Sequence, residues 1–141
     1  MPITQAMCDS FKVELLNGAQ NFSADTYKIA LYTSAATLSN ATTAYTTSNE
    51  VANGGGYTTG GNVLVVSQTP TSTGNVAFIS FANSTWANAT ITAAGALIYN
   101  NSQANSAVAS LSFGGDKTST SGTFAVIFPT PDATSAIIRI A

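Results

Sequence analysis

The chain offers few side chains for acid–base or nucleophilic chemistry. It has no histidine, one cysteine, Cys8, and six carboxylates, which are Asp9, Glu14, Asp25, Glu50, Asp116 and Asp132. Without histidine, neither a Ser-His-Asp nor a Cys-His arrangement can form, and a common metal ligand is missing. Two carboxylates could still do acid–base work, but no two have a local spacing that indicates a shared site. We therefore expect no enzyme, no cofactor and no metal ion.

Charge is scarce along the whole sequence. Charged residues make up 7% of it, whereas about 25% is typical of globular proteins. The four cations and six anions give a net charge of −2, so no basic surface exists for phosphates and we expect no nucleic-acid partner. So little charge favours association. The surface is either kept in water by hydroxyl and amide groups or largely covered in an assembly, and we slightly favour the assembly.

The sequence shows neither the apolar run of a membrane-spanning segment nor the features of an export signal. No apolar stretch approaches the roughly 18 residues that span a bilayer, so we expect no membrane partner. The first residues, Met1–Thr4, lack the charged start and apolar run of a signal peptide, so we expect synthesis in a cytoplasm. A lone cysteine cannot form an intrachain disulfide, and Cys8 is expected to be a small buried residue.

The segment Ala93–Asn100 is the expected centre of the fold. It is short, apolar and uncharged, and it lies between turn-forming residues, which is typical of a buried strand. Gly95 has no Cβ, so another backbone or a large ring can lie close to it. The hydroxyl of Tyr99 is expected to find a hydrogen-bond partner at the margin of the sheet.

One amphipathic helix is expected before the strands begin. Thr4 is a suitable N-cap, helical spacing continues from Gln5 to Asn17, and Gly18 is a suitable stop. The apolar positions that share one face are Met7, Phe11 and Leu15. Two roles remain open for this helix of about three turns: covering one end of the sheet, which we favour, or reaching into a neighbouring subunit.

A strand and a long polar loop follow the helix. Residues 26–33 alternate as a strand with two different faces, and a covered Lys28 would need a carboxylate, for which Glu50 is our candidate. Residues 34–61 are rich in Thr, Ser, Asn and Gly and show little periodicity, which is long for a loop in a compact domain. The glycine run 54–61 is not followed by a helical pattern, so it predicts tight turns that position Glu50 and Tyr57 rather than a phosphate site.

The rest of the chain predicts further strands. They are expected at 62–68, 75–82, 89–92, 93–100, 106–113, 122–128 and 133–140, with a turn at Pro70 and the clearest turn at Gly114–Lys117, where Asp116 lies in solvent. Arg139, on the last strand, is expected to pair with a carboxylate. The prediction is a mainly β protein, an antiparallel β-sandwich or jelly-roll-like domain of about eight strands with one N-terminal helix. Residues 1–141 form a single domain, with the helix at about 4–17 and the sandwich at about 22–141.

Several motifs resemble small structural proteins of the virions of tailed bacteriophages. They are spread over nearly the whole chain: Met1–Cys8 with Phe11–Lys12 and Glu14–Leu16, Lys28–Tyr32, Asn49–Val51 with Gly56–Gly61, Gly95–Asn100, Phe113–Lys117, Phe128–Thr130 and Ile137–Arg139. The pairing of Asn-Glu-Val with Gly-Tyr-Thr-x-Gly-Gly is the most specific of these features, and it does not separate head from tail proteins.

The resemblance implies a capsid cement (decoration) protein, made in the bacterial host cytoplasm and located on the capsid surface of the virion. Its partner would be the major capsid protein, and it would be a homo-oligomer, with a trimer favoured. The helix and the loop 34–61 would carry the contacts. The candidate interface or structural residues are Phe11, Leu15, Lys28, Glu50, Tyr57 and Arg139.

Two other functions remain open. A phage tail, fibre or adhesin module could bind a host-surface glycan by stacking sugars on exposed Tyr57, Trp86 and Tyr99, although core positions are favoured for Trp86 and Tyr99. A small hydrolase would need two carboxylates that converge in a pocket.

Overall fold

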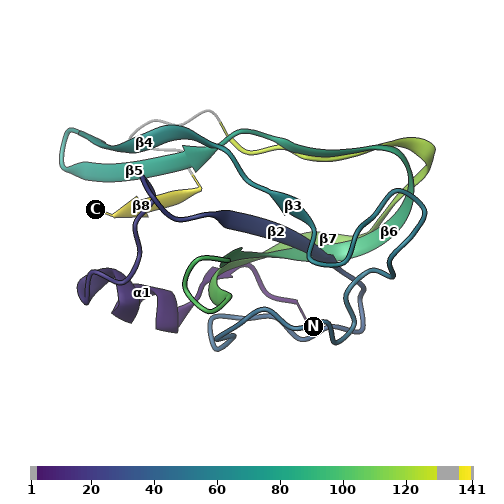
Figure 1. Ribbon diagram of the computed structural model, residues 1–141, viewed down its shortest axis with the longest axis horizontal. Helices are drawn as coiled ribbons and strands as arrows, with labels where there is room; N and C mark the ends of the chain where they lie inside the picture. Colours follow the sequence, from purple (N-terminus) through teal and green to yellow (C-terminus); the bar gives the residue numbers. More distant parts are fainter. Residues whose placement is uncertain (1–2, 130–136, 141) are drawn as a thin grey trace.

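A computed structural model describes residues 3–129 and 137–140, and it confirms the mainly β fold class. The described chain forms one helix and eight strands in two antiparallel sheets (Figure 1). Their bounds are β1 Ala6–Met7, α1 Asp9–Leu16, β2 Tyr27–Tyr32, β3 Asn62–Val63, β4 Val66–Thr73, β5 Val76–Phe81, β6 Ser84–Asn100, β7 Ser106–Val126 and β8 Ile138–Ile140. None of its helices is long and apolar enough to cross a membrane.

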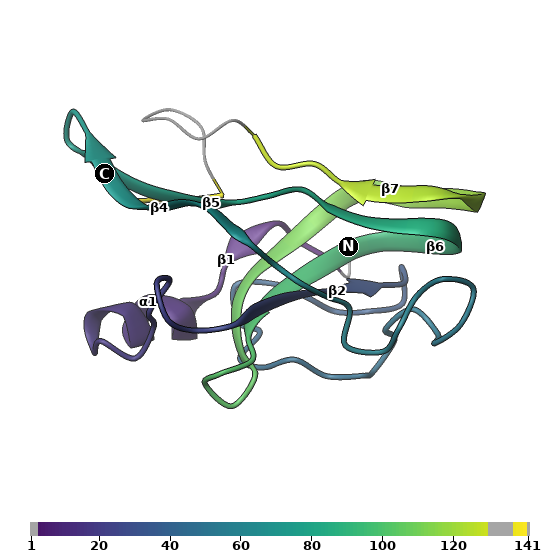
Figure 2. The ribbon, with the colours of Figure 1, turned by 45° about the horizontal axis from the view of Figure 1, so that its top comes forward.

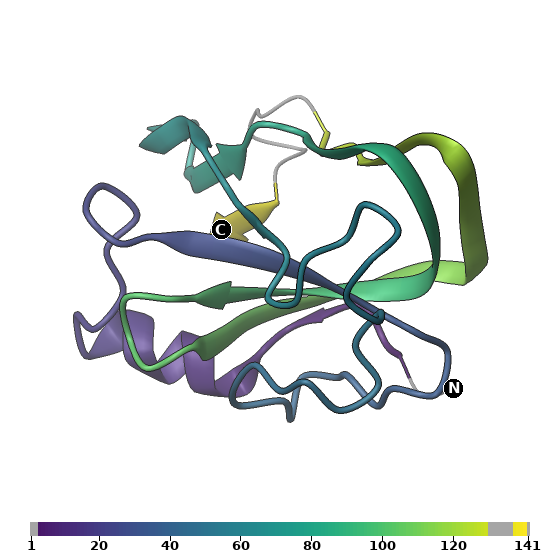
Figure 3. The same ribbon diagram turned by 45° about the vertical axis from the view of Figure 1, so that its right-hand side comes forward.

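The two sheets are connected by a long ribbon made of β6 and β7. The larger sheet has the order β1-β7-β6-β2-β3, and the smaller one has the order β4-β5-β8. β6 and β7 pair from Asn100↔Ser106 to Ser84↔Val126, and they bend together at one side of the molecule (Figure 3). The half of the ribbon that includes Asn100 and Ser106 lies beside β2 and β1, and the far half, which ends at Ser84 and Val126, returns above β2 towards β5 (Figure 1).

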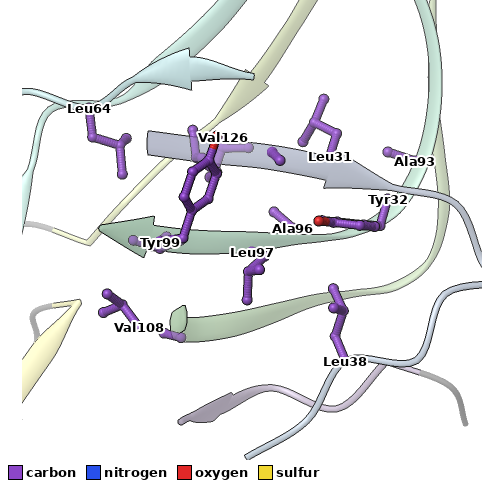
Figure 4. Close-up of a cluster of buried hydrophobic side chains, with 14 of the residues drawn as sticks. Leu31, Tyr32, Leu38, Leu64, Ala93, Ala96, Leu97, Tyr99, Val108 and Val126 are labelled. Carbon is purple, nitrogen blue, oxygen red and sulfur yellow. The ribbon is translucent and has the colours of Figure 1, made fainter. Parts of the chain in front are cut away.

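The expected central strand is the most deeply buried part of the chain. Ala93–Asn100 is buried throughout as the second half of β6, between β2 and β7 (Figure 4). A Cβ on Gly95 would lie 2.5 Å from the carbonyl oxygen of Leu111, so this close approach requires glycine. On the other side, β2 is buried at every position except the half-buried Lys28, which explains its apolar composition.

The helix begins four residues later than its spacing predicted. Ala6 and Met7 form β1, which pairs with Ser110 and Ala109 of β7, and Cys8 is extended with φ −71° and ψ 138°. The predicted N-cap at Thr4 is therefore wrong, because pairing with a distant strand replaces the first helical turn. The predicted stop is confirmed: Asn17 is the C-cap and Gly18 has φ 73°.

Three expected turns and strands differ in the structure. Gly114–Lys117 is not a turn between strands but a bulge inside β7, where Ala93↔Lys117 is followed by Gly95↔Ser112. Pro70 lies within β4, an edge strand, where its missing N–H costs no ladder bond. The expected strand 62–68 is split between β3 and β4, which belong to different sheets. Of the expected strand 133–140, residues 133–136 lie outside the described part.

Candidate functional site

Glu50 is the centre of a hydrogen-bonded cluster that holds the loop 34–61 against the larger sheet. Its Oε1 accepts a hydrogen bond from the Tyr45 hydroxyl at 2.7 Å, and its Oε2 accepts from the Tyr57 hydroxyl at 2.6 Å. The backbone N–H of Gly60 donates to the same Oε2 at 2.7 Å. All three donors are neutral groups, so the half-buried carboxylate is stabilised by short, charge-assisted bonds without a cation.

The glycine run gives the loop the shape that this cluster needs. Gly54, Gly55, Gly56, Gly60 and Gly61 all have positive φ, a conformation that other residues adopt at a cost. A Cβ on Gly61 would overlap the carbonyl oxygen of Ile29 in β2, so the loop lies directly against the backbone at the edge of β2. The prediction that this run forms tight turns that position Glu50 and Tyr57 is confirmed.

The tyrosines of the cluster connect it to β2 and β6. The Tyr57 hydroxyl also accepts a hydrogen bond from the backbone N–H of Leu31 at 3.0 Å. The Tyr99 hydroxyl donates to the carbonyl oxygen of Gly60 at 2.6 Å, as expected for a partner at the sheet margin, and its ring stacks on Tyr45 with centroids 4.6 Å apart. Burial raises the pKa of Tyr99 to about 12. Burial, and next the bond to Glu50, raise the pKa of Tyr57 and Tyr45 further.

Lys28 does not pair with Glu50, so the predicted ion pair is wrong. Both oxygens of Glu50 accept hydrogen bonds from the two tyrosines and from Gly60 instead. Lys28 is half-buried on β2, and its Nζ lies near Gly60, 3.4 Å from the position that a Cβ there would take. The part of Tyr45 was not predicted, because its spacing to Glu50 follows no strand or helix period.

A second polar network lies at the other end of β2 and was not predicted. The Gln20 side chain donates to Glu14 Oε1 at 2.9 Å and to Ser106 Oγ at 3.2 Å, and its own oxygen accepts from Tyr27 and from Asn100, each at 2.8 Å. Asn100 also donates to Asp25 Oδ2 at 2.8 Å. This network fixes the chain after α1 onto the turn between β6 and β7. It links the carboxylates of Glu14 and Asp25 through the amide side chains of Gln20 and Asn100.

The other candidate residues lie in two kinds of place. Phe11 and Tyr57 are fully buried, so they belong to the core rather than to an open interface. Leu15 and Arg139 line a hollow of about 380 Å³ beside α1, whose other lining residues are Met7, Lys12, Leu16 and Ile140. Next to it, α1 exposes large apolar side chains: Leu16 is 90% exposed and Val13 is 57% exposed. Large side chains such as these are the part of α1 that is free to contact another molecule.

The chemistry expected for the alternative functions finds little support in the geometry. Tyr57, Trp86 and Tyr99 are at most 4% exposed, so the core positions favoured for Trp86 and Tyr99 are confirmed, and none of the three offers an exposed face on which a sugar could stack. Among residues 3–129 and 137–140, no group of three or more potential ligands could hold a metal ion. Cys8 is buried as expected, and burial raises the pKa of its thiol to about 11. Asp132 lies outside the described residues.

Comparison with protein-family models, with curated proteins and with solved structures finds no match to this chain.

Proposed function

We propose that this protein is a capsid cement (decoration) protein of a tailed bacteriophage, which binds the major capsid protein on the outside of the shell and stabilises it. The observation that carries the proposal is the apolar surface of α1, where Leu16 is 90% exposed beside the hollow lined by Leu15 and Ile140. The class of partner is proposed from the resemblance of several motifs to virion proteins, above all Asn49–Val51 and Gly56–Gly61.

The function requires binding free energy and no chemical step. Contacts across a seam between two capsid subunits raise the free energy needed to separate them. Burying a leucine side chain contributes about 1.5–3 kcal/mol. The low charge of the chain means that few ions must be desolvated when such a face is covered. We place the protein on the capsid surface as a homo-oligomer, for which the resemblance favours a trimer.

The Glu50 cluster has a supporting part in this proposal. A cement protein must keep its contact loops in one shape, because ordering a loop on binding subtracts from the affinity. Three bonds to Glu50 hold the loop 34–61 before any partner arrives. The loop and α1 are thus two preformed surfaces for the shell.

Binding to capsids tests the proposal. The purified chain is mixed with empty, unexpanded capsids and with expanded capsids of the encoding phage, and the bound fraction is measured by sedimentation. We expect saturable binding, and Leu16→Ser should weaken it about 10-fold or more, since about 1.4 kcal/mol corresponds to a factor of ten. The matched control is Val65→Ser, because Val65 is 64% exposed on a different surface.

Two results would reject this proposal. Failure to bind either form of the capsid removes the function itself. If Leu16→Ser and Val65→Ser weaken capsid binding equally, α1 is not the binding surface, because the effect would then depend on the apolarity of the surface in general.

A further inference from the structure

The far half of β7 has one edge without a partner strand in the described part of the chain. On its inner side β7 pairs with β6 as far as Val126, but on its outer side it pairs with β1 only at Ala109 and Ser110. Ser121, with φ 47°, marks a bulge in β7, and beyond it β7 continues to Val126 and is followed by Ile127. The segment Gly122–Ile127 has no proline and no charge, and the register shift opposite it, between Trp86 and Ala89, has its extra residue in β6. Figure 2 shows this half of β7 at the outside of the ribbon, with β6 beneath it. Free edges of this kind are templates for another strand.

An apolar groove runs along the same edge. It has a volume of about 490 Å³ and is lined by Phe113, Thr123–Ile127 and residues 117–119. The rings of Phe113 and Phe124 lie 6.2 Å apart within this lining, and Ile127 is 67% exposed beside them. Lys117 is the charged side chain in the lining. Strand addition gains affinity from backbone hydrogen bonds and specificity from such side-chain sites.

We propose that this edge pairs with the same edge of a second copy of the chain, antiparallel and about a two-fold axis at Ala125. Two identical strands are complementary when they run antiparallel, because each presents the same alternation of N–H and C=O groups. About this axis Phe124 lies opposite the partner subunit's Val126, and Thr123 lies opposite the partner subunit's Ile127. The exposed Ile127 is then covered by pairing.

Charge is the reason for choosing a second copy as the occupant. An edge that faces itself places every charge opposite or diagonal to its own copy, and natural edges use lysines to prevent this pairing. Gly122–Ile127 has no such lysine and no carboxylate, so nothing in it repels an identical strand. The two-fold axis predicts a dimer, whereas the resemblance to virion proteins implies a trimer, so the two expectations can be separated by mass.

A charge-reversal pair tests the axis directly. Residues opposite each other on paired strands have Cβ atoms about 4.5–5.5 Å apart, so Ala125→Lys would place two ammonium groups together and Ala125→Glu two carboxylates. By analytical ultracentrifugation we expect the full-length wild type to have the mass of two 14.3 kDa chains. Each variant should have the mass of one, and an equimolar mixture of the two should recover the mass of two.

The control introduces the same alanine-to-lysine substitution on a strand that is paired on both sides. Ala77 is exposed on β5, which pairs with β4 on one side and with β8 on the other, so Ala77→Lys should leave the dimer intact. Circular dichroism checks that each variant is folded, as expected for exposed positions. A monomeric or trimeric wild type, a dimer that Ala125→Lys leaves intact, or folded variants that fail to associate when mixed would each overturn the inference. Capsid binding is measured separately, so its failure does not affect this result.

Discussion

Replacing Glu50 by alanine is the sharpest test of how the long loop is held. The substitution removes the acceptor of three hydrogen bonds, from Tyr45, Tyr57 and the backbone N–H of Gly60. The hydroxyl of Tyr57 is deeply buried, so water cannot easily replace the lost carboxylate there. The structure therefore predicts a loss of global stability and not only a local rearrangement of the loop.

The magnitude follows from the type of bond. A hydrogen bond to a charged group contributes about 1.5–3 kcal/mol. Glu50 is only half-buried, so the lower limit applies to each bond, and the three together give about 3–5 kcal/mol. Domains of this kind unfold with about 5–15 kcal/mol, so the Glu50→Ala protein should still fold. Its melting temperature should fall by about 10 °C.

Urea unfolding followed by tryptophan fluorescence measures the effect. Trp86 is the single tryptophan, and its ring lies 6.1 Å from that of Tyr57, so it reports on this region. Asp116→Ala removes an exposed carboxylate from the β7 bulge and should change stability by no more than about 0.5 kcal/mol. A loss below about 1 kcal/mol for Glu50→Ala would refute the cluster as the anchor of the loop.

Three further outcomes are expected. Gly61→Ala should lower the free energy of unfolding by several times the roughly 1 kcal/mol expected for Gly74→Ala. Both glycines have positive φ, but only at Gly61 would a Cβ clash with β2, so equal losses in urea unfolding would contradict this prediction. All five tyrosines have a pKa raised above 10, chiefly by burial, so their contribution to stability should be fully present below pH 10 and be lost as the pH rises further; folded tyrosines that ionise near pH 10 by absorbance would contradict this. The thiol of Cys8 should react with a thiol reagent only on unfolding; rapid labelling of the native protein would refute its burial.

Local pattern predicted the centre of the fold well. The strand expected at 26–33 was found at 27–32 from its alternation of side chains. The segment Ala93–Asn100 was found because an uncharged apolar run bounded by turn residues is typical of a buried strand. The glycine run was also correctly predicted to form tight turns that position Glu50 and Tyr57, although their hydrogen bond to each other was not predicted. In each case the deciding information lies within about ten residues of sequence.

Distant contacts explain what the pattern could not predict. The start of α1 was missed because residues 6–7 pair with β7, about a hundred residues away. Gly114–Lys117 has the composition of a turn, but the same residues suit a bulge, and only the continuous partner β6 decides between them. The partner of Glu50 was misassigned for a similar reason: charge counting favours Lys28, whereas the folded chain supplies neutral donors.

The use of neutral hydrogen-bond donors in place of cations bears both on the interior and on the surface of the protein. Glu50, Glu14 and Asp25 are each held by hydroxyl, amide or backbone N–H groups, so the fold can satisfy its half-buried carboxylates while using few lysines and arginines. The scarcity of charge also leaves the edge Gly122–Ile127 without a charged side chain that would repel an identical strand, whereas α1 carries Asp9 and Lys12 beside its exposed Leu16 and Val13. If both proposals hold, α1 contacts the capsid and β7 contacts a second copy. Leu16→Ser should then weaken capsid binding without changing the mass of the free protein, and Ala125→Lys should change that mass while each single chain still binds.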